Sequence, residues 1–437
     1  MLKSICIQLW NRRRSNTTLL VELVLVFCLV WYMTDYLFVY LYNTRIPNYR
    51  NIEHTWRLNV TLFPENHPEY LPAENEPEAL EAHYRRILQA VHNHPGVEAV
   101  AVCDQYSTPE SGNYRGGGFY PEGDTSRMAS GQMISFYPQE DFFRTFRYSR
   151  QEGSEPVSVA DFDWGDPQAI VISRSVAEEL FPDREAVGKA ILRQSYYEAD
   201  SIGLRHVVAG VIDDTKRFAY NRPQRNFYLP MTLTHINDYR IAAISVRSNA
   251  STPDAIFLEN FRREMSRSLR VGNFYLKNIV SYATLQEDIT RAFGITGQIR
   301  TRLYLMIFFL LNILLCTMGT FWYRANQRRG EVGLRKALGA TNESIFRSFL
   351  LEGLCLLAVG GAIAMLIELQ FVRAGLIETM GQRPDMRHYL PDRMLPRFLI
   401  TNFLSACLLS VVILISVWLP ARKSAALSPS EALASNE

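Results

Sequence analysis

Five polar side chains interrupt the long apolar runs of this 437-residue sequence: Glu22, Asp35, Asn312, Glu352 and Glu368. Carboxylates inside a membrane are costly, and they often mark a proton or ion pathway. A proton-driven carrier places such groups near the midplane, whereas most of these lie within about two turns of the end of their run. We therefore predict that Glu22, Glu352 and Glu368 reach interfacial water, and we leave the roles of Glu22, Asp35 and Glu352 open.

The sequence contains no complete motif for phosphate binding, zinc binding or acid/base catalysis. The pair Gly188-Lys189 has neither the flanking glycine nor the Ser or Thr of a phosphate-binding loop. His92 and His94 are two residues apart near the end of a predicted helix, and two ligands leave a zinc site incomplete. The aspartates of "DFDWGD", residues 161–166, have no spacing that selects an acid/base pair. We expect no catalytic residue, metal or cofactor on this chain.

The apolar runs themselves approach or reach the roughly 20 residues that cross a bilayer. The first run is longer than the h-region of a signal peptide, about 7–15 residues, so we interpret it as an uncleaved anchor. The transmembrane helices that we predict are 18–42, 301–323, 346–369 and 398–419.

Basic residues set the predicted orientation. They gather in segments 1–17 and 324–345, which favours the cytoplasmic side for both, although the connection 370–397 is nearly as basic. Alternating crossings then place 43–300 and 370–397 outside the cytoplasm and the tail 420–437 inside.

Charge and cysteine content exclude two further classes. The net charge of +2 leaves no extended basic face for a nucleic acid. Of the six cysteines only Cys103 falls in the large outer segment, so no intrachain disulfide can stabilise it.

The outer segment repeats one order of elements. Alternating apolar residues predict strands and a 3.6-residue stripe predicts helices, and the resulting order is strand 55–63, helix 76–96, strand 97–103, then strand 240–248, helix 254–269, strand 274–282. This pattern predicts a split β-α-β-β-α-β lobe with a second lobe inserted near 104–239. The insertion begins with a Gly-, Ser- and Pro-rich stretch, 107–127, that we predict to be a loop. The fold class is thus an α-helical membrane protein with four transmembrane helices and a large α+β extracytoplasmic domain.

Only Gly294 and Gly297 interrupt the chain between this domain and the second membrane helix. Two interpretations stay open: a stalk helix continuous with the membrane helix, or a hinge at the glycines.

The stretch "RRGEVGLRKALGAT", residues 328–341, is a short charged helix between two membrane helices. Gly339 suits a left-handed cap, and Thr341 or Asn342 is a cap for the following helix. Leu334, Ala337 and Leu338 share an apolar face, and Arg335 and Lys336 point away from it. So short a helix is marginal alone, and either anionic lipid or a protein groove can be its support.

This stretch resembles the E-[IV]-G-[LI]-R-[KR]-A-L-G-A-[TS] segment of the MacB/FtsX family of ABC-transporter permeases, which contacts the ATPase subunit. Segments 136–154, 169–191, 207–217 and 226–232 are similar to the MacB-type periplasmic domain, and 419–433 is similar to the family's cytoplasmic tail. The resemblance implies an ATPase-docking site at Glu331, Val332, Gly333, Leu334, Arg335, Lys336, Ala337, Leu338, Gly339, Ala340 and Thr341.

The resemblance also implies partners. ATP and Mg would be bound by a separate ABC ATPase, and a second permease copy or a paralogue would complete a dimer in the bacterial inner membrane, with the large domain in the periplasm. Substrate, and participation of a membrane-fusion protein and an outer-membrane channel, stay open. The small residues Gly353, Gly360, Gly361 and Ala364 favour close helix packing in a bundle or a dimer seam. The alternative is an envelope receptor or signalling protein whose basic helix binds anionic lipid.

Overall fold

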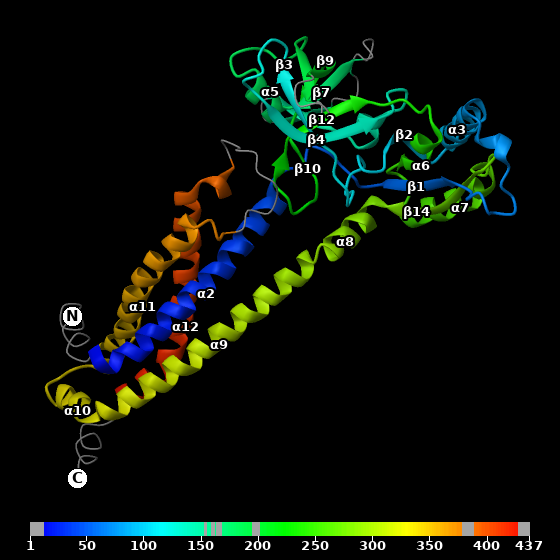
Figure 1. Ribbon diagram of the computed structural model, residues 1–437. Helices are drawn as coiled ribbons and strands as arrows, with labels where there is room; N and C mark the ends of the chain where they lie inside the picture. Colours follow the sequence, from blue (N-terminus) through cyan, green and yellow to red (C-terminus); the bar gives the residue numbers. More distant parts are fainter. Residues whose placement is uncertain are drawn as a thin grey trace. The chain divides into compact units, whose positions relative to one another are not determined.

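The structure is a computed structural model that describes residues 13–152, 155–158, 162, 168–194, 202–377 and 389–426 (Figure 1). The chain divides into two compact units. We call residues 43–294 the α+β unit, and we call the long helices with the short helix between them the helical unit. The aspartates at 161, 163 and 166 lie outside the described residues.

The first lobe of the α+β unit is formed by the two ends of its sequence. Its elements are β1 (Thr55–Leu62), η1 (Pro72–Asn75), α3 (Pro77–His92), β2 (Val97–Asp104), β13 (Ala242–Ser248), α7 (Asp254–Ser268), β14 (Phe274–Ser281) and α8 (Tyr282–Ala292). The strands lie in the order β2-β13-β1-β14 and all neighbours are antiparallel. This is the predicted split β-α-β-β-α-β arrangement, which the structure confirms.

One hydrophobic core holds this lobe together. The stripe of α3, from Leu80 to Val91, is buried together with Phe257 and Phe261 of α7 and the inward side chains of β1 and β13. Burying a side chain of this size stabilises the fold by about 1.5–3 kcal/mol. The amphipathic spacing therefore specifies which face of each helix packs on the sheet.

The inserted lobe extends the same sheet. Its elements are β3 (Gly116–Pro121), β4 (Ala129–Phe136), α4 (Phe142–Thr145), β5 (Ser149–Glu152), β6 (Glu155–Ser158), β7 (Ala169–Ser173), α5 (Arg174–Leu180), β8 (Ala190–Gln194), β9 (Ile202–Ile212), β10 (Thr215–Lys216), β11 (Pro223–Gln224), β12 (Asn226–Pro230) and α6 (Ile236–Ile241). The ten-stranded order is β12-β7-β9-β8-β3-β4-β2-β13-β1-β14, and β4 joins β2 at the pair Phe136 and Cys103. Both lobes thus share one sheet.

Two local predictions in this region are wrong. The stretch predicted as a loop contains strand β3, because its glycines allow a close approach: a Cβ on Gly117 would lie 2.6 Å from Sδ of Met133 in β4. Arg240 and Ile241 were predicted to begin a strand but complete helix α6, whose first turn is fixed by a capping box between His235 and Asp238.

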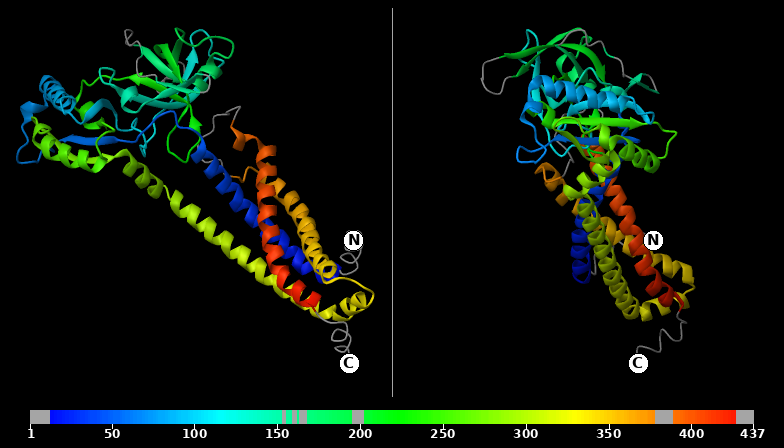
Figure 2. Two further views of the ribbon diagram at one scale, coloured as in Figure 1. Left: turned by 180° about the vertical axis from the view of Figure 1, so that it is seen from behind. Right: turned by 90° about the vertical axis from the view of Figure 1, so that its right-hand side faces the viewer.

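The helical unit contains α2 (Arg13–Arg45), α9 (Ile295–Gln327), α10 (Arg329–Ala337), α11 (Asn342–Arg373), η2 (Leu390–Asp392) and α12 (Met394–Ala426). Four of these, α2, α9, α11 and α12, are long and apolar enough to cross a membrane. They lie side by side toward the end of the bundle that carries α10 (Figure 2).

The small residues of α11 make this packing possible. A Cβ on Gly353 would lie 3.0 Å from Ile413 of α12, and one on Gly361 would lie 3.0 Å from Phe27 of α2. Gly360 faces α2 in the same way, and Ala364 is fully buried. These residues therefore line contacts inside the bundle of one chain.

The passage from α8 to α9 is interrupted by two residues. α8 ends at Ala292, α9 begins at Ile295, and Gly294 between them has φ of +68°. Gly297, by contrast, lies inside α9. A helix continuous through this point, one of the two open interpretations, is therefore not formed.

Candidate functional site

The end of helix α10 and the start of α11 are specified by residues next to one another in the sequence. Gly339 has φ of +94°, its N–H donates to Lys336 O at 2.9 Å, and the N–H of Ala340 donates to Arg335 O at 3.0 Å. This is a Schellman cap, which glycine favours. Thr341 then caps α11, since its Oγ1 accepts a hydrogen bond from the N–H of Ser344 at 3.2 Å. The predicted caps at Gly339 and Thr341 are confirmed.

The two faces of α10 have opposite surroundings. Val332 and Gly333 are buried, and Val332 belongs to the core of the bundle. On the other face Leu334 is 57% exposed and Leu338 is 80% exposed. The Nζ of Lys336 donates to Ala425 O in the last turn of α12 at 2.6 Å. The helix is thus fixed to the bundle on one side and presents leucines on the other.

A buried ion cluster fixes the beginning of α10. Glu352 of α11 accepts from Arg324 of α9 at 3.0 Å and from Arg328, the residue between α9 and α10, at 2.6 Å. All three side chains are less than a tenth exposed. Removing one partner of a buried ion pair typically costs about 3–5 kcal/mol, because the remaining charge loses its partner. The cluster therefore couples the position of α10 to both α9 and α11.

The other polar residues of the apolar runs differ in environment. Asp35 pairs with Arg397 of α12, with Oδ1 2.8 Å from Nε, and both are buried. Glu22 accepts from Sγ of Cys316 at 2.6 Å, Asn312 is exposed, and Glu368 is fully buried. The prediction that Glu352 and Glu368 reach interfacial water is wrong, because neighbouring helices enclose both.

The α+β unit contacts the last residues of α2 and the segment that follows them. We call residues 43–54 the N-terminal connector. Asn43 Nδ2 donates to Tyr220 O at 3.0 Å, and Lys216 bonds back to the carbonyl of Asn43. Arg50 forms an ion pair with Glu110 at 3.4 Å. These contacts tie the connector to the inserted lobe.

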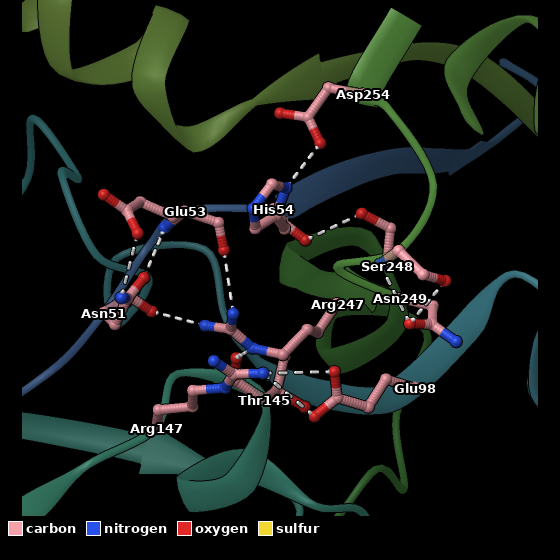
Figure 3. Close-up of polar contacts among 11 residues, drawn as sticks. Asn51, Glu53, His54, Glu98, Thr145, Arg147, Arg247, Ser248, Asn249 and Asp254 are labelled. Atoms are coloured by element: carbon pink, nitrogen blue, oxygen red, sulfur yellow. Dashed lines mark hydrogen bonds and ion pairs between the residues drawn. The ribbon is translucent and has the colours of Figure 1, made fainter. Parts of the chain in front are cut away.

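A buried arginine ties the same connector to the first lobe (Figure 3). Arg247 of β13 donates to the carbonyls of Asn51 at 2.6 Å, Glu53 at 2.8 Å and Thr145 at 2.6 Å. Burial, and next the nearby Arg147, lower the pKa of Arg247 to about 10. Its three acceptors are backbone groups of the connector and of the C-terminal end of α4, so this guanidinium joins two separate segments to the sheet.

Sequence reasoning missed both arginine clusters. Arg324 and Arg328 carry a signal, since i, i+4 spacing places them on one face of a helix. Arg247 carries a weaker signal, a charged residue within a predicted strand. The acceptors of Arg247 are distant in sequence and follow no motif.

The two histidines singled out above face different acids. His92 Nε2 lies 2.6 Å from Glu140, and His94 Nε2 lies 3.4 Å from Glu264. Among the residues that the structure describes, no three His, Cys, Asp or Glu side chains gather in a group that could hold a metal ion.

Comparison with known proteins matches both units. Residues 303–429 match the FtsX-like permease C-terminal family model, and residues 46–257 match the MacB-like periplasmic core domain model. The chain is 25% identical over 273 residues to a probable export ATP-binding/permease protein of Pseudomonas fluorescens, covering 61% of this chain and 38% of that protein. It is 24% identical over 307 residues to macrolide export ATP-binding/permease protein MacB 1 of Yersinia pestis bv. Antiqua, covering 68% and 42%.

The chain spans about two fifths of the length of these relatives. Among solved structures, the extracellular domain of the noncanonic ABC-type transporter YknZ from Gram-positive bacteria aligns with 14% identity, coverage of 51% and 100%, and a TM-score of 0.29. The periplasmic region of MacB from Actinobacillus actinomycetemcomitans aligns with 12% identity, coverage of 55% and 94%, and a TM-score of 0.30.

Proposed function

The chain belongs to the MacB/FtsX-type permeases of ABC transporters, and from this premise we propose that it is a mechanotransmission subunit. An ATPase on another chain would dock on α10, and the helical unit would transmit the motion to the α+β unit. The observation that carries the proposal is the exposed leucine pair Leu334 and Leu338 on a helix whose other face is fixed to the bundle core.

The fixed side of α10 supports the transmission step. Val332 packs in the bundle core, and the ion cluster of Arg328 with Glu352 links the start of α10 to α11. A displacement of α10 must therefore displace α9 and α11, or expose a buried charge at a cost of several kcal/mol. A force applied to the leucine face reaches the membrane helices through these contacts.

The remaining parts of the assembly follow from this proposal. ATP and Mg would be bound by the ATPase, and two ATPase subunits would require two docking helices, hence a second permease copy or a paralogue. The motion would drive export or extraction of a peptide, an antibiotic or a lipoprotein across or from the bacterial inner membrane. A periplasmic membrane-fusion protein and an outer-membrane channel would complete an export route.

The test is a pair of charge substitutions on the exposed face. We expect Leu334→Asp with Leu338→Asp to reduce co-purification of an ABC ATPase from native membranes by at least about tenfold, because desolvated anchor side chains each contribute more than about 1 kcal/mol to an interface. Membrane insertion should be unchanged, since neither side chain contacts the bundle core.

A matched control is Leu71→Asp with Leu204→Asp, two leucines of the α+β unit that are 56% and 68% exposed. This variant should retain the ATPase. Survival of ATPase binding in the α10 variant would end the proposal. The receptor alternative would gain support if that variant instead lost binding to vesicles containing phosphatidylglycerol.

A further inference from the structure

One polar side chain lies on the exposed face of α9, in the middle of its apolar run. Asn312 is exposed and stands near the centre of the helix. Its neighbours on this face are large side chains that are each more than half exposed, Tyr304, Phe308 and Leu315. The Asn312 side chain forms no hydrogen bond with any residue that the structure describes.

The opposite side of α9 packs in the bundle of its own chain. Ile313 and Phe321 belong to the bundle core. Thr317 is buried as well, and its Oγ1 bonds to Oγ of Ser416 in α12 at 2.8 Å. Of the most apolar stretch of α9, however, 11% is buried within the chain, compared with 39% for α2, 39% for α11 and 33% for α12. The face that carries Asn312 is therefore left uncovered by the chain's own helices.

A carboxamide at this depth requires a polar partner. The hydrocarbon interior of a bilayer holds no water, so an unpaired polar group that faces lipid tails is costly. Lipid tails have neither donors nor acceptors, whereas the Asn side chain offers two N–H donors and one carbonyl acceptor. The group that matches Asn312 in both respects is a second carboxamide.

We propose that this face of α9 packs against the same face of α9 in a second copy of this chain, with the two Asn312 side chains hydrogen-bonded to each other. In a two-fold symmetric dimer with its axis along the membrane normal, identical residues of parallel helices lie at the same depth and contact each other. Asn side chains form hydrogen bonds between membrane helices. The inference deepens the proposed function, because it identifies the second permease as an identical copy and names its contact surface.

A glycine on the same face allows the two helices to approach closely. Gly319 follows Asn312 by about two turns, which returns it to the same side of the helix. A Cβ at Gly319 would meet nothing within 4 Å in the single chain. Small residues at such positions are typical of contacts between membrane helices.

Cysteine cross-linking in native membranes tests the contact directly. Asn312→Cys should yield a disulfide-linked homodimer on oxidation, because two cysteines join only when their Cα atoms lie within about 7 Å. Val359→Cys is the matched control, since Val359 is 49% exposed near the middle of α11. The unsubstituted chain, which has free cysteines of its own, gives the baseline. Above that baseline we expect at least about fivefold more linked dimer at 312 than at 359.

Two substitutions then test what holds the contact together, with the purified full chain in the absence of an ATPase. Asn312→Leu should weaken the association of two differently tagged copies about three- to tenfold, because the hydrogen bond between the helices is lost. Gly319→Ile should weaken it through added bulk, although the space around Gly319 is open in one chain. Ala358→Ile, which enlarges an exposed side chain of α11, should leave association unchanged. The melting temperature of each variant, measured on single chains in dilute micelles, should equal that of the wild type, which separates loss of association from loss of folding.

Three results would overturn the proposal. They are equal cross-linking at 312 and 359, unchanged association in both α9 variants, and a cross-link from the Asn312→Cys variant to a different protein. Leu334→Asp with Leu338→Asp should leave the cross-link of Asn312→Cys intact, and Asn312→Leu should leave ATPase co-purification intact. Failure of this inference is therefore distinguishable from failure of the proposed function.

Discussion

The α+β unit is joined to apolar helices at two places that differ in construction. The N-terminal connector, residues 43–54, is bonded to both lobes through Lys216, Arg50 and Arg247. The junction before α9 consists of Phe293 and Gly294, and a Cβ on Gly294 would meet nothing within 4 Å. One connection is fixed by many polar contacts, and the other is a point where the helix is interrupted.

The connector and the junction at Gly294 also differ in backbone conformation. In the described part of the chain, positive φ outside glycine occurs at His54, Glu110 and Arg147. His54 ends the connector, Glu110 pairs with its Arg50, and Arg147 lies beside Arg247. Such strain persists only where the surroundings over-determine the backbone, whereas Gly294 adopts positive φ without it. The connector is therefore held in a strained conformation by its contacts, whereas Gly294 adopts its conformation without strain.

The largest effect is expected from Arg247→Met. Three carbonyls would lose their donor, one in a buried and two in part-buried hydrogen bonds. Because a buried group left unsatisfied costs about 1–3 kcal/mol, the free energy of local opening should fall by about 3 kcal/mol. Hydrogen exchange of peptides covering 51–57 and 242–248, measured on the purified full chain, would report this loss.

The neighbouring Arg147 provides the control for that experiment. It pairs with Glu98 at 3.2 Å, but the side chains are 47% and 30% exposed, and exposed pairs contribute about 0–1 kcal/mol. Arg147→Met should therefore leave exchange nearly unchanged. Equal effects of the two substitutions would show that Arg247 does not hold the connector.

An intermediate effect is expected at the glycine junction. Gly294→Ala forces a Cβ into the left-handed region at a cost of about 1–2 kcal/mol. Gly297→Ala lies inside α9 and should stabilise it by about 0.5–1 kcal/mol. Peptides covering 289–299 should exchange faster in the first variant and slower in the second. Slower exchange in both would mean that α8 and α9 become one helix in solution.

Local signals in the sequence predicted most of the elements that position these features. The stripe on α3 and the caps of α10 and α11 depend on side chains within a few residues of one another, so spacing suffices to identify them. Strand β3 was missed because glycine is read as a loop former, although here it permits contact with Met133 of the neighbouring strand.

Residue spacing did not predict the polar contacts between segments that are distant in the sequence. Glu352 was expected to reach water because it lies near the end of an apolar run, but it pairs with Arg324 of α9 and with Arg328, which follows α9. Arg247 finds acceptors near residues 51 and 145. Such partners are determined by packing of distant segments, and no spacing rule in one sequence specifies them.

The smallest effect concerns the ion pair between the connector and the inserted lobe. Burial raises the pKa of Glu110 to about 6, against the opposing charges of Arg50 and Lys216. Because the folded state then binds the proton more tightly than the unfolded state, the contribution of Glu110 is complete below about pH 4.5 and is lost as the pH rises through about 6.

Relative to Glu110→Gln, the wild-type chain should therefore lose opening free energy between about pH 4.5 and pH 6, by at most about 2 kcal/mol. Hydrogen exchange of connector peptides at several pH values, corrected for intrinsic exchange rates, measures this difference. A pH-independent difference between the two proteins would mean that Arg50 compensates the carboxylate fully. The pair of Arg50 and Glu110 would then add no pH-dependent stability, and the connector would be held by the contacts of Arg247, Lys216 and Asn43.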